Sequence, residues 1–88
     1  MSLDVKEFSN LAARSPYPMQ PPIGGASLTT AGTTTYTVAG PGVTYVELFA
    51  NGATHTFTVS DSAVTQTFAQ GERHIYGLRK GAVITVTA

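Results

Sequence analysis

Hydrophobic and polar residues alternate with a period of two on both sides of Asn51-Gly52. The two runs are VTYVELFA, residues 43–50, and ATHTFTVS, residues 53–60. Alternation of this kind is typical of a strand with one buried face, and Asn-Gly favours a type I′ turn because both residues tolerate positive φ. The pattern therefore predicts an antiparallel hairpin with Leu48 opposite His55. Its buried face is expected to comprise Thr44, Val46, Leu48, Ala50, Ala53, His55, Phe57 and Val59.

Further short β-type runs follow through the rest of the chain, separated by glycine-containing or polar breaks. They are expected at residues 27–30, 33–38, 64–69, 73–78 and 82–87. Strands spaced about ten residues apart favour an all-β fold, a small antiparallel β-sandwich or barrel. The core candidates from the later strands are Val64, Phe68, Ile75, Ile84 and Val86.

The run TTTYTV, residues 33–38, predicts an edge strand that lacks the usual protection against pairing. It contains no charged residue and no proline, the residues that normally blunt a sheet edge. We therefore expect a neighbouring copy or a partner to cover it by adding a strand or a loop. Thr33, Thr35 and Tyr36 are the candidate binding residues of this edge.

The first 25 residues predict an N-terminal arm in front of a β domain at residues 26–88. Asp4 and Glu7 have capping-box spacing, and the apolar residues that follow recur at helical spacing, so residues 4–14 are predicted to form a short helix. Residues 15–25, SPYPMQPPIGG, are expected to run extended, since proline fixes φ and lacks a backbone donor.

A helix this short is marginal alone, so its apolar stripe must dock on a surface, either of its own domain or of a neighbour. The arm's candidate partner-binding residues are Leu3, Val5, Phe8, Leu11, Tyr17, Met19 and Ile23. Tyr45 and Phe49, on the polar side of the predicted hairpin, complete the candidate binding set.

Composition limits the classes of partner. The chain has 88 residues, no cysteine, a formal net charge of zero and only 11% charged residues. A domain of about 60 residues buries only about 60% of its unfolded surface, so we expect added stability from a homo-oligomer, a dimer or trimer, or from a docked partner. Without a basic excess or a long apolar run, we expect no nucleic-acid and no membrane binding. The mixed charges at the N-terminus do not match a signal peptide, so synthesis in the cytoplasm is expected.

Catalytic and metal-binding patterns are weak. Glu72 and His74 alternate on one side of a strand and offer two metal ligands without a third, so an ordinary solvated strand start is favoured. His55 is expected to be a hydrogen-bonded residue of the buried face. With no nucleophile motif, phosphate loop or carboxylate pair, the sequence predicts a protein that is not an enzyme and has no catalytic residue, metal or cofactor.

Aromatic residues leave a second class of function open. A platform for sugar, as in a carbohydrate-binding module, could be built from Tyr36, Tyr45, Phe49 and Tyr76. The polar groups that normally converge on such a platform are not evident, because the neighbouring residues are mainly threonines.

The layout as a whole resembles the small head decoration (cement) proteins of tailed bacteriophages. An N-terminal segment rich in Pro, Gly and Ala precedes a Thr/Val-rich β domain that ends in an apolar strand, residues 82–86, AVITV. The resemblance covers the whole chain in layout and composition. It implies a non-enzymatic virion structural protein that binds the major capsid protein or another virion protein, often as a trimer.

The resemblance further implies a location on the capsid surface, after assembly in the host cytoplasm, and stabilisation of the head by the arm and the β domain. Two alternatives remain: a β-sandwich binding module of a tail fibre or of a carbohydrate-binding protein, and another small virion component such as a collar or connector protein.

Overall fold

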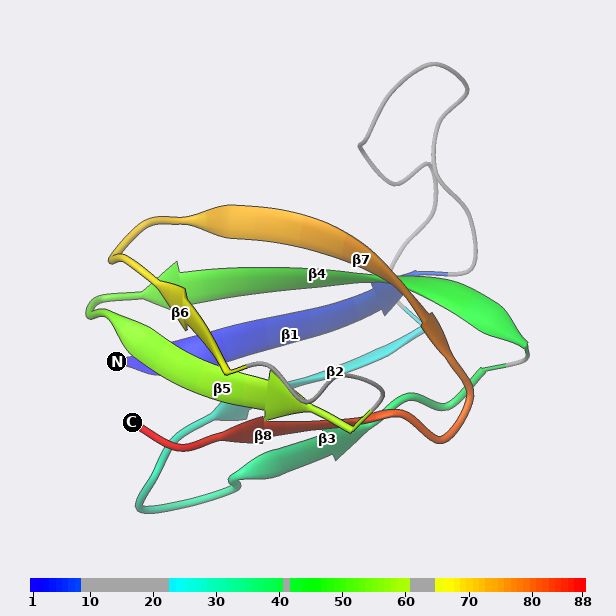
Figure 1. The fold of residues 1–88 in the computed structure, drawn as a ribbon, viewed down its shortest axis with the longest axis horizontal. Coiled ribbons are helices and arrows are strands. Elements are labelled where there is room, and N and C mark those ends of the chain that lie inside the picture. The colour runs from blue at the N-terminus through cyan, green and yellow to red at the C-terminus, as the bar shows by residue number, and fades with distance from the viewer. Residues whose placement is uncertain (9–22, 41, 61–64) are drawn as a thin grey trace.

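The computed structural model describes residues 1–8, 23–40, 42–60 and 65–88. These residues form two four-stranded antiparallel sheets, with strand orders β2-β1-β4-β7 and β3-β8-β5-β6 (Figure 1). The described residues contain no helix, so the prediction of an all-β, sandwich-like fold is confirmed. The strands are β1 Ser2–Phe8, β2 Gly24–Leu28, β3 Thr35–Thr37, β4 Val43–Asn51, β5 His55–Val59, β6 Gln66–Phe68, β7 Arg73–Arg79 and β8 Val83–Val86.

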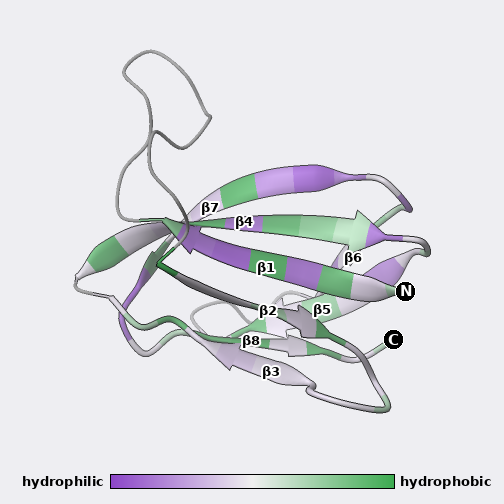
Figure 2. Cartoon of the chain, turned by 180° about the vertical axis from the view of Figure 1, so that it is seen from behind, coloured by the Kyte–Doolittle hydropathy of each residue, from purple (hydrophilic) through white to green (hydrophobic). Residues whose placement is uncertain are grey.

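A single apolar core fills the space between the two sheets. Alternate residues of each long strand point into it, as the alternating hydropathy along β1 and β4 illustrates (Figure 2). Of the later core candidates, Phe68, Ile84 and Val86 are buried, whereas Val64 lies outside the described residues. The prediction for Ile75 is wrong, because Ile75 is the register partner of the outward-facing Glu47 and the inward residues of β7 that pack on the core are Tyr76 and Leu78. The core comprises Leu3, Val5, Leu28, Val38, Val46, Leu48, Ala50, Phe57, Val59, Phe68, Ala82, Ile84 and Val86.

The predicted hairpin between β4 and β5 is wrong, although its buried face is nearly right. Gly52 has the expected positive φ of 81°, but the turn carries the chain from one sheet to the other. β4 pairs with β1 and β7, whereas β5 pairs with β8 and β6. Two strands in facing sheets turn their apolar sides toward each other, so they show the same alternation as two hydrogen-bonded strands of a hairpin. Alternation therefore identified the buried side chains but not the pairing.

The predicted helix at residues 4–14 is wrong for the residues that the structure describes. Residues 2–8 form β1, which lies inside the first sheet between β2 and β4, and residues 9–14 lie outside the described part. Leu3, Val5 and Glu7 point inward with at most 2% of their surface exposed. The strand is favoured over the helix because β2 and β4 pair with both edges of β1 and satisfy its backbone hydrogen bonds, while one face of β1 is buried in the core. The capping-box spacing of Asp4 and Glu7 offers no comparable stabilisation. No N-terminal arm with a helix is therefore seen in the described residues.

β2 approaches β1 closely because it begins with two glycines. A Cβ atom at Gly25 would lie 2.3 Å from the carbonyl oxygen of Val5. Only glycine allows this separation of the two backbones. The predicted boundary of the Pro-rich segment at residue 25 therefore falls inside a strand that starts at Gly24.

Candidate functional site

The outward-facing side of the first sheet carries an apolar surface at one end. Along β4, Val43 and Tyr45 alternate with the buried Thr44 and Val46, and so face away from the core. Val43 is 60% exposed and Tyr45 is 37% exposed. Neither side chain belongs to the core between the two sheets.

The row of residues that crosses the sheet at Tyr45 carries no charged side chain, whereas Arg79 is the register partner of Val43. Phe8 on β1 is the register partner of Tyr45, and Tyr45 in turn faces Gly77 on β7. The N–H of Ile23 donates to the carbonyl of Glu7 at 2.7 Å, which places Ile23 beside the end of β1. Ile23 is 46% exposed, whereas Phe8, flanked by Ile23 and Tyr45, is only 6% exposed. We call Ile23, Phe8, Tyr45 and Gly77 the tyrosine row.

The other end of this outer face is polar and internally paired. The Arg73 guanidinium carbon lies 4.6 Å from the centre of the Phe49 ring, and its Nε lies 3.8 Å from Glu47 Oε1. Asn51 Nδ2 donates to Asp4 Oδ2 at 3.1 Å. Burial raises the pKa of the Asp4 carboxyl, but hydrogen bonds from neighbouring side chains outweigh burial and leave that pKa below its usual value. These charges already have partners, so they do not attract a charged ligand strongly.

A shallow hollow of about 330 Å³ lies where β2 meets β1. It is open because the β2 residues beside it, 24–27, have side chains no larger than that of serine. Of the described residues that line it, Lys6 and Asp4 are the charged ones, and they bear opposite charges. The hollow therefore lacks the converging polar groups of a specific small-molecule site.

A buried carboxylate, that of Glu7, ties the two sheets together. Glu7 is fully buried and accepts hydrogen bonds from Tyr36 Oη at 2.6 Å and from Thr44 Oγ1 at 2.8 Å. It also accepts the backbone N–H groups of Ala39 and Gly40, each at 3.0 Å. Tyr36 belongs to the second sheet and Thr44 to the first, while Ala39 and Gly40 lie in the connection between them. All four donors are neutral, and they leave the carboxylate no open position for a substrate.

The electrostatics of this cluster follow from burial and hydrogen bonding. Burial raises the pKa of the Glu7 carboxyl, but the hydrogen bonds from Tyr36, Ala39, Thr44 and Gly40 outweigh it and hold that pKa below its usual value. Burial and the adjacent carboxylate both raise the pKa of the Tyr36 phenol. The arrangement keeps Glu7 ionised and Tyr36 protonated, which suits a structural tie.

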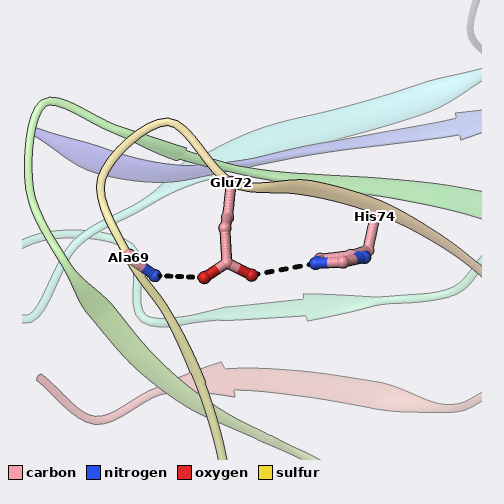
Figure 3. Close-up of polar contacts among 3 residues, drawn as sticks. All are labelled: Ala69, Glu72 and His74. Atoms are coloured by element: carbon pink, nitrogen blue, oxygen red, sulfur yellow. Dashed lines mark hydrogen bonds and ion pairs between the residues drawn. The ribbon is translucent and has the colours of Figure 1, made fainter.

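Glu72, at the end of the turn between β6 and β7, pairs with His74 on β7 (Figure 3). His74 Nε2 donates to Glu72 Oε2 at 2.9 Å, and the Ala69 N–H donates to Glu72 Oε1 at 3.0 Å. These hydrogen bonds, that from Ala69 first, lower the pKa of Glu72. In the part of the chain that the structure covers, no three His, Cys, Asp or Glu residues are placed to hold a metal ion. Glu72 therefore accepts a backbone hydrogen bond that closes the turn. With His74 it offers two candidate metal ligands, and no third lies beside them among the described residues.

His55 lies on the inner face of β5, as predicted, and is 8% exposed. Its Nδ1 donates to the carbonyl oxygen of Ala88 at 3.1 Å. The buried Nε2 has no hydrogen-bond partner among the described residues. The ring thus links β5 to Ala88, two residues beyond the end of β8.

The candidate binding residues from the sequence fall into three groups. Leu3 and Val5 are core residues, so their apolar character is explained without a partner. Leu11, Tyr17 and Met19 lie outside the described residues. The structure brings the remaining residues to two surfaces, the outer face of the first sheet and the free edge of the second. These residues are Phe8, Ile23, Tyr45 and Phe49 on the face, and Thr33, Thr35 and Tyr36 at the edge.

The four aromatics of the proposed sugar platform are not brought together. Tyr45 and Phe49 share the outer face, but Tyr36 points inward to Glu7. Tyr76 lies on the inner side of β7, with its ring centre 6.3 Å from that of Phe68. Burial and the charge of Glu72 raise the pKa of the Tyr76 phenol.

Two functional or structural residues were missed from the sequence. Val43 was assigned only to a strand, although its position two residues before Tyr45 places it on the same exposed face. Glu7 was read as a helix cap, although the series Leu3, Val5, Glu7 already has the period of a strand. In both cases the period-two alternation contained the signal.

Comparison with protein-family models, with curated proteins and with solved structures finds no match to this chain. Within the described ranges, no helix reaches the length and apolar character needed to cross a membrane. The functional interpretation therefore rests on the surfaces described above.

Proposed function

We propose that this chain is a non-enzymatic structural protein that docks on a larger protein assembly through the tyrosine row and Val43. The observation that carries the proposal is that Val43 and Tyr45 share one end of a sheet face, with Ile23 hydrogen-bonded to the end of β1 beside them, and that each of the three is at least 37% exposed. Aromatic and aliphatic side chains with this exposure are typical of the centre of protein interfaces.

The chemistry of the face favours a protein over other partners. A formal net charge of zero provides no electrostatic attraction for nucleic acid. A sugar site needs polar groups that converge on an aromatic ring, whereas the register neighbours of Tyr45 are Phe8 and Gly77. A flat apolar surface on the partner complements this row best.

The size of the face favours a contact that is repeated. The tyrosine row with Val43 is one part of the outer face, and the whole face, four strands spaced ~4.8 Å apart with ~7 residues each, presents on the order of 400 Å². This is about half of the ~800 Å² that each partner buries in a standard interface. A weak contact of this size becomes effective when copies of the chain are joined in an oligomer, because the second contact to the same assembly is then intramolecular.

Capsid decoration is the specific form of this function that we propose, through contact with the major capsid protein on the surface of a phage head. It rests on the resemblance in layout and composition, together with a docking face suited to a repeating lattice. A tail-fibre module or a collar protein would use the same face on a different virion protein.

Co-sedimentation with assembled phage heads that lack this protein tests the proposal. The double variant Val43→Ser/Tyr45→Ser is expected to lose at least tenfold in affinity, because it removes the exposed apolar groups of β4. Val83→Ser is the matched control, since Val83 lies on the outward side of β8 in the other sheet. Unchanged binding of the double variant would contradict the docking face, and absence of binding by the wild-type protein would contradict capsid decoration.

A further inference from the structure

β3 is the outermost strand of the second sheet and pairs only with β8 among the described strands (Figure 1). The pairing continues beyond its three residues, because Val86 N donates to Thr34 O at 2.9 Å and Val38 N donates to Ala82 O at 2.8 Å. Backbone groups of successive residues in a strand point to opposite edges. Thr34, Tyr36 and Val38 therefore face β8, and the N–H and C=O groups of Thr35 and Thr37 point outward.

The outward edge is held rigidly and carries no charge. The Tyr36 side chain points inward and donates to Glu7, which fixes the rotation of the strand about its axis. Thr35 and Thr37 are both exposed. No charged residue or proline occurs in residues 33–38. The carbonyl of Thr33 accepts the N–H of Thr29 at 2.8 Å, whereas the outward backbone groups of Thr35 and Thr37 have no backbone partner among the described residues. These two residues therefore form an open edge without the common devices that prevent pairing.

The other three edge strands differ from β3. β7 carries Arg73 and Arg79 at its two ends, and β2 begins with two glycines, which weaken a strand. β6 has three residues, and in the described part of the chain no further backbone hydrogen bond extends its pairing with β5, unlike β3. β3 is therefore the edge best prepared to accept another strand.

We propose that β3 pairs antiparallel with β3 of a second copy of this chain about a two-fold axis at Tyr36. In this register Thr35 of one copy exchanges both backbone hydrogen bonds with Thr37 of the other, and the two second sheets join into one continuous sheet. This surface belongs to the second sheet, so the inference goes beyond the proposed docking function of the first.

The absence of charge identifies a second copy as the occupant. In a symmetric antiparallel pair each residue lies opposite or near its own counterpart, so any charged side chain would face a like charge across the axis. The segment that would pair is neutral throughout, and threonine–threonine pairs across strands are favourable. A partner of different sequence could place an opposite charge across from a charged residue, so pairing with it would not require this edge to be uncharged.

Analytical ultracentrifugation of the full chain from about 10 μM to 1 mM tests the pairing; an interface this small is expected to give a weak dimer. Thr35→Lys places like charges across the axis, and Thr35→Pro removes an outward N–H while leaving the bonds to β8 intact. Both variants are expected to weaken dimerisation at least tenfold. Thr54→Lys, at an exposed threonine outside the strands, is the matched control and should dimerise like the wild type.

A wild-type protein that stays monomeric at 1 mM, or dimers that both Thr35 variants leave unchanged, would overturn the proposal. Amide hydrogen exchange of the wild-type protein provides the second measurement if a variant fails to fold. Exchange at Thr35 and Thr37 should slow as the protein concentration rises, with Thr54 unaffected. Equal exchange rates at low and high concentration, or slowing only when a different protein is added, would also overturn it.

Discussion

Glu7 places a charged side chain at a position that alternation assigns to the core. The carboxylate is buried because four donors from three segments reach it, and these segments include both sheets. A buried charge with every acceptor satisfied stabilises one arrangement of the surrounding backbone and penalises others. The connection from β3 to β4 is therefore held by a side chain that is distant in sequence.

The pH dependence of stability should report on Glu7. Its pKa is lower in the folded chain than the unfolded value near 4.5, so its contribution is full above that value and is lost as the pH falls through the folded pKa. Glu7→Gln points an amide donor at N–H groups and should cost ~2–3 kcal/mol at pH 7. The difference between wild type and variant should shrink at about pH 3, as urea unfolding at both pH values would measure. A difference independent of pH would contradict this account.

The hydroxyl of Tyr36 should matter more than that of an exposed tyrosine. Tyr36→Phe removes a donor to a buried carboxylate and is expected to lower the free energy of unfolding by ~1.5–3 kcal/mol. Tyr45→Phe alters a side chain on the outer face and should stay within ~0.5 kcal/mol. Thermal or urea unfolding of the two variants makes the comparison, and equal effects would show that the Tyr36–Glu7 bond adds no stability.

At the scale of the elements, the sequence predicted which segments are strands far better than how they pair. Seven β runs were expected close to the seven strands from β2 to β8, because apolar residues with a period of two mark a half-buried strand. The first strand was missed because Asp4, Glu7 and Phe8 also fit the start of a helix. The spacing of residues within one segment cannot show that β2 and β4 pair with it. Tertiary pairing decided between two local patterns that were both plausible.

Neighbouring residues on β1 should therefore differ sharply in their tolerance to substitution. Val5 is 2% exposed, and Val5→Ser should cost ~2–3 kcal/mol through lost burial and an added buried hydroxyl. Lys6 faces outward, so Lys6→Ser should cost less than ~0.5 kcal/mol. Chemical denaturation of the two variants tests the strand assignment. Similar costs at the two positions would contradict a half-buried β1.

At the scale of the whole molecule, the two proposed surfaces lie on different sheets. Phe8, Ile23, Tyr45 and Phe49 were singled out from the sequence in separate segments, and the register of the first sheet brings them to one face. Their proximity could not be predicted, since Tyr45 and Phe49 had been placed in a hairpin and Phe8 on a helix. The edge position of β3 was predicted, because it depends on composition within one segment.

The passage of the chain from β4 into the opposite sheet at Gly52 has a consequence for the rate of folding. Of the described strands that follow one another along the chain, only β1 with β2 and β5 with β6 are hydrogen-bonded partners, and more than two residues separate the strands of each pair. Folding must then close long loops before most backbone bonds can form, which is the slow regime of milliseconds to seconds. Stopped-flow refolding of the chain should show this, and a microsecond relaxation would instead indicate early local pairing of β4 with β5.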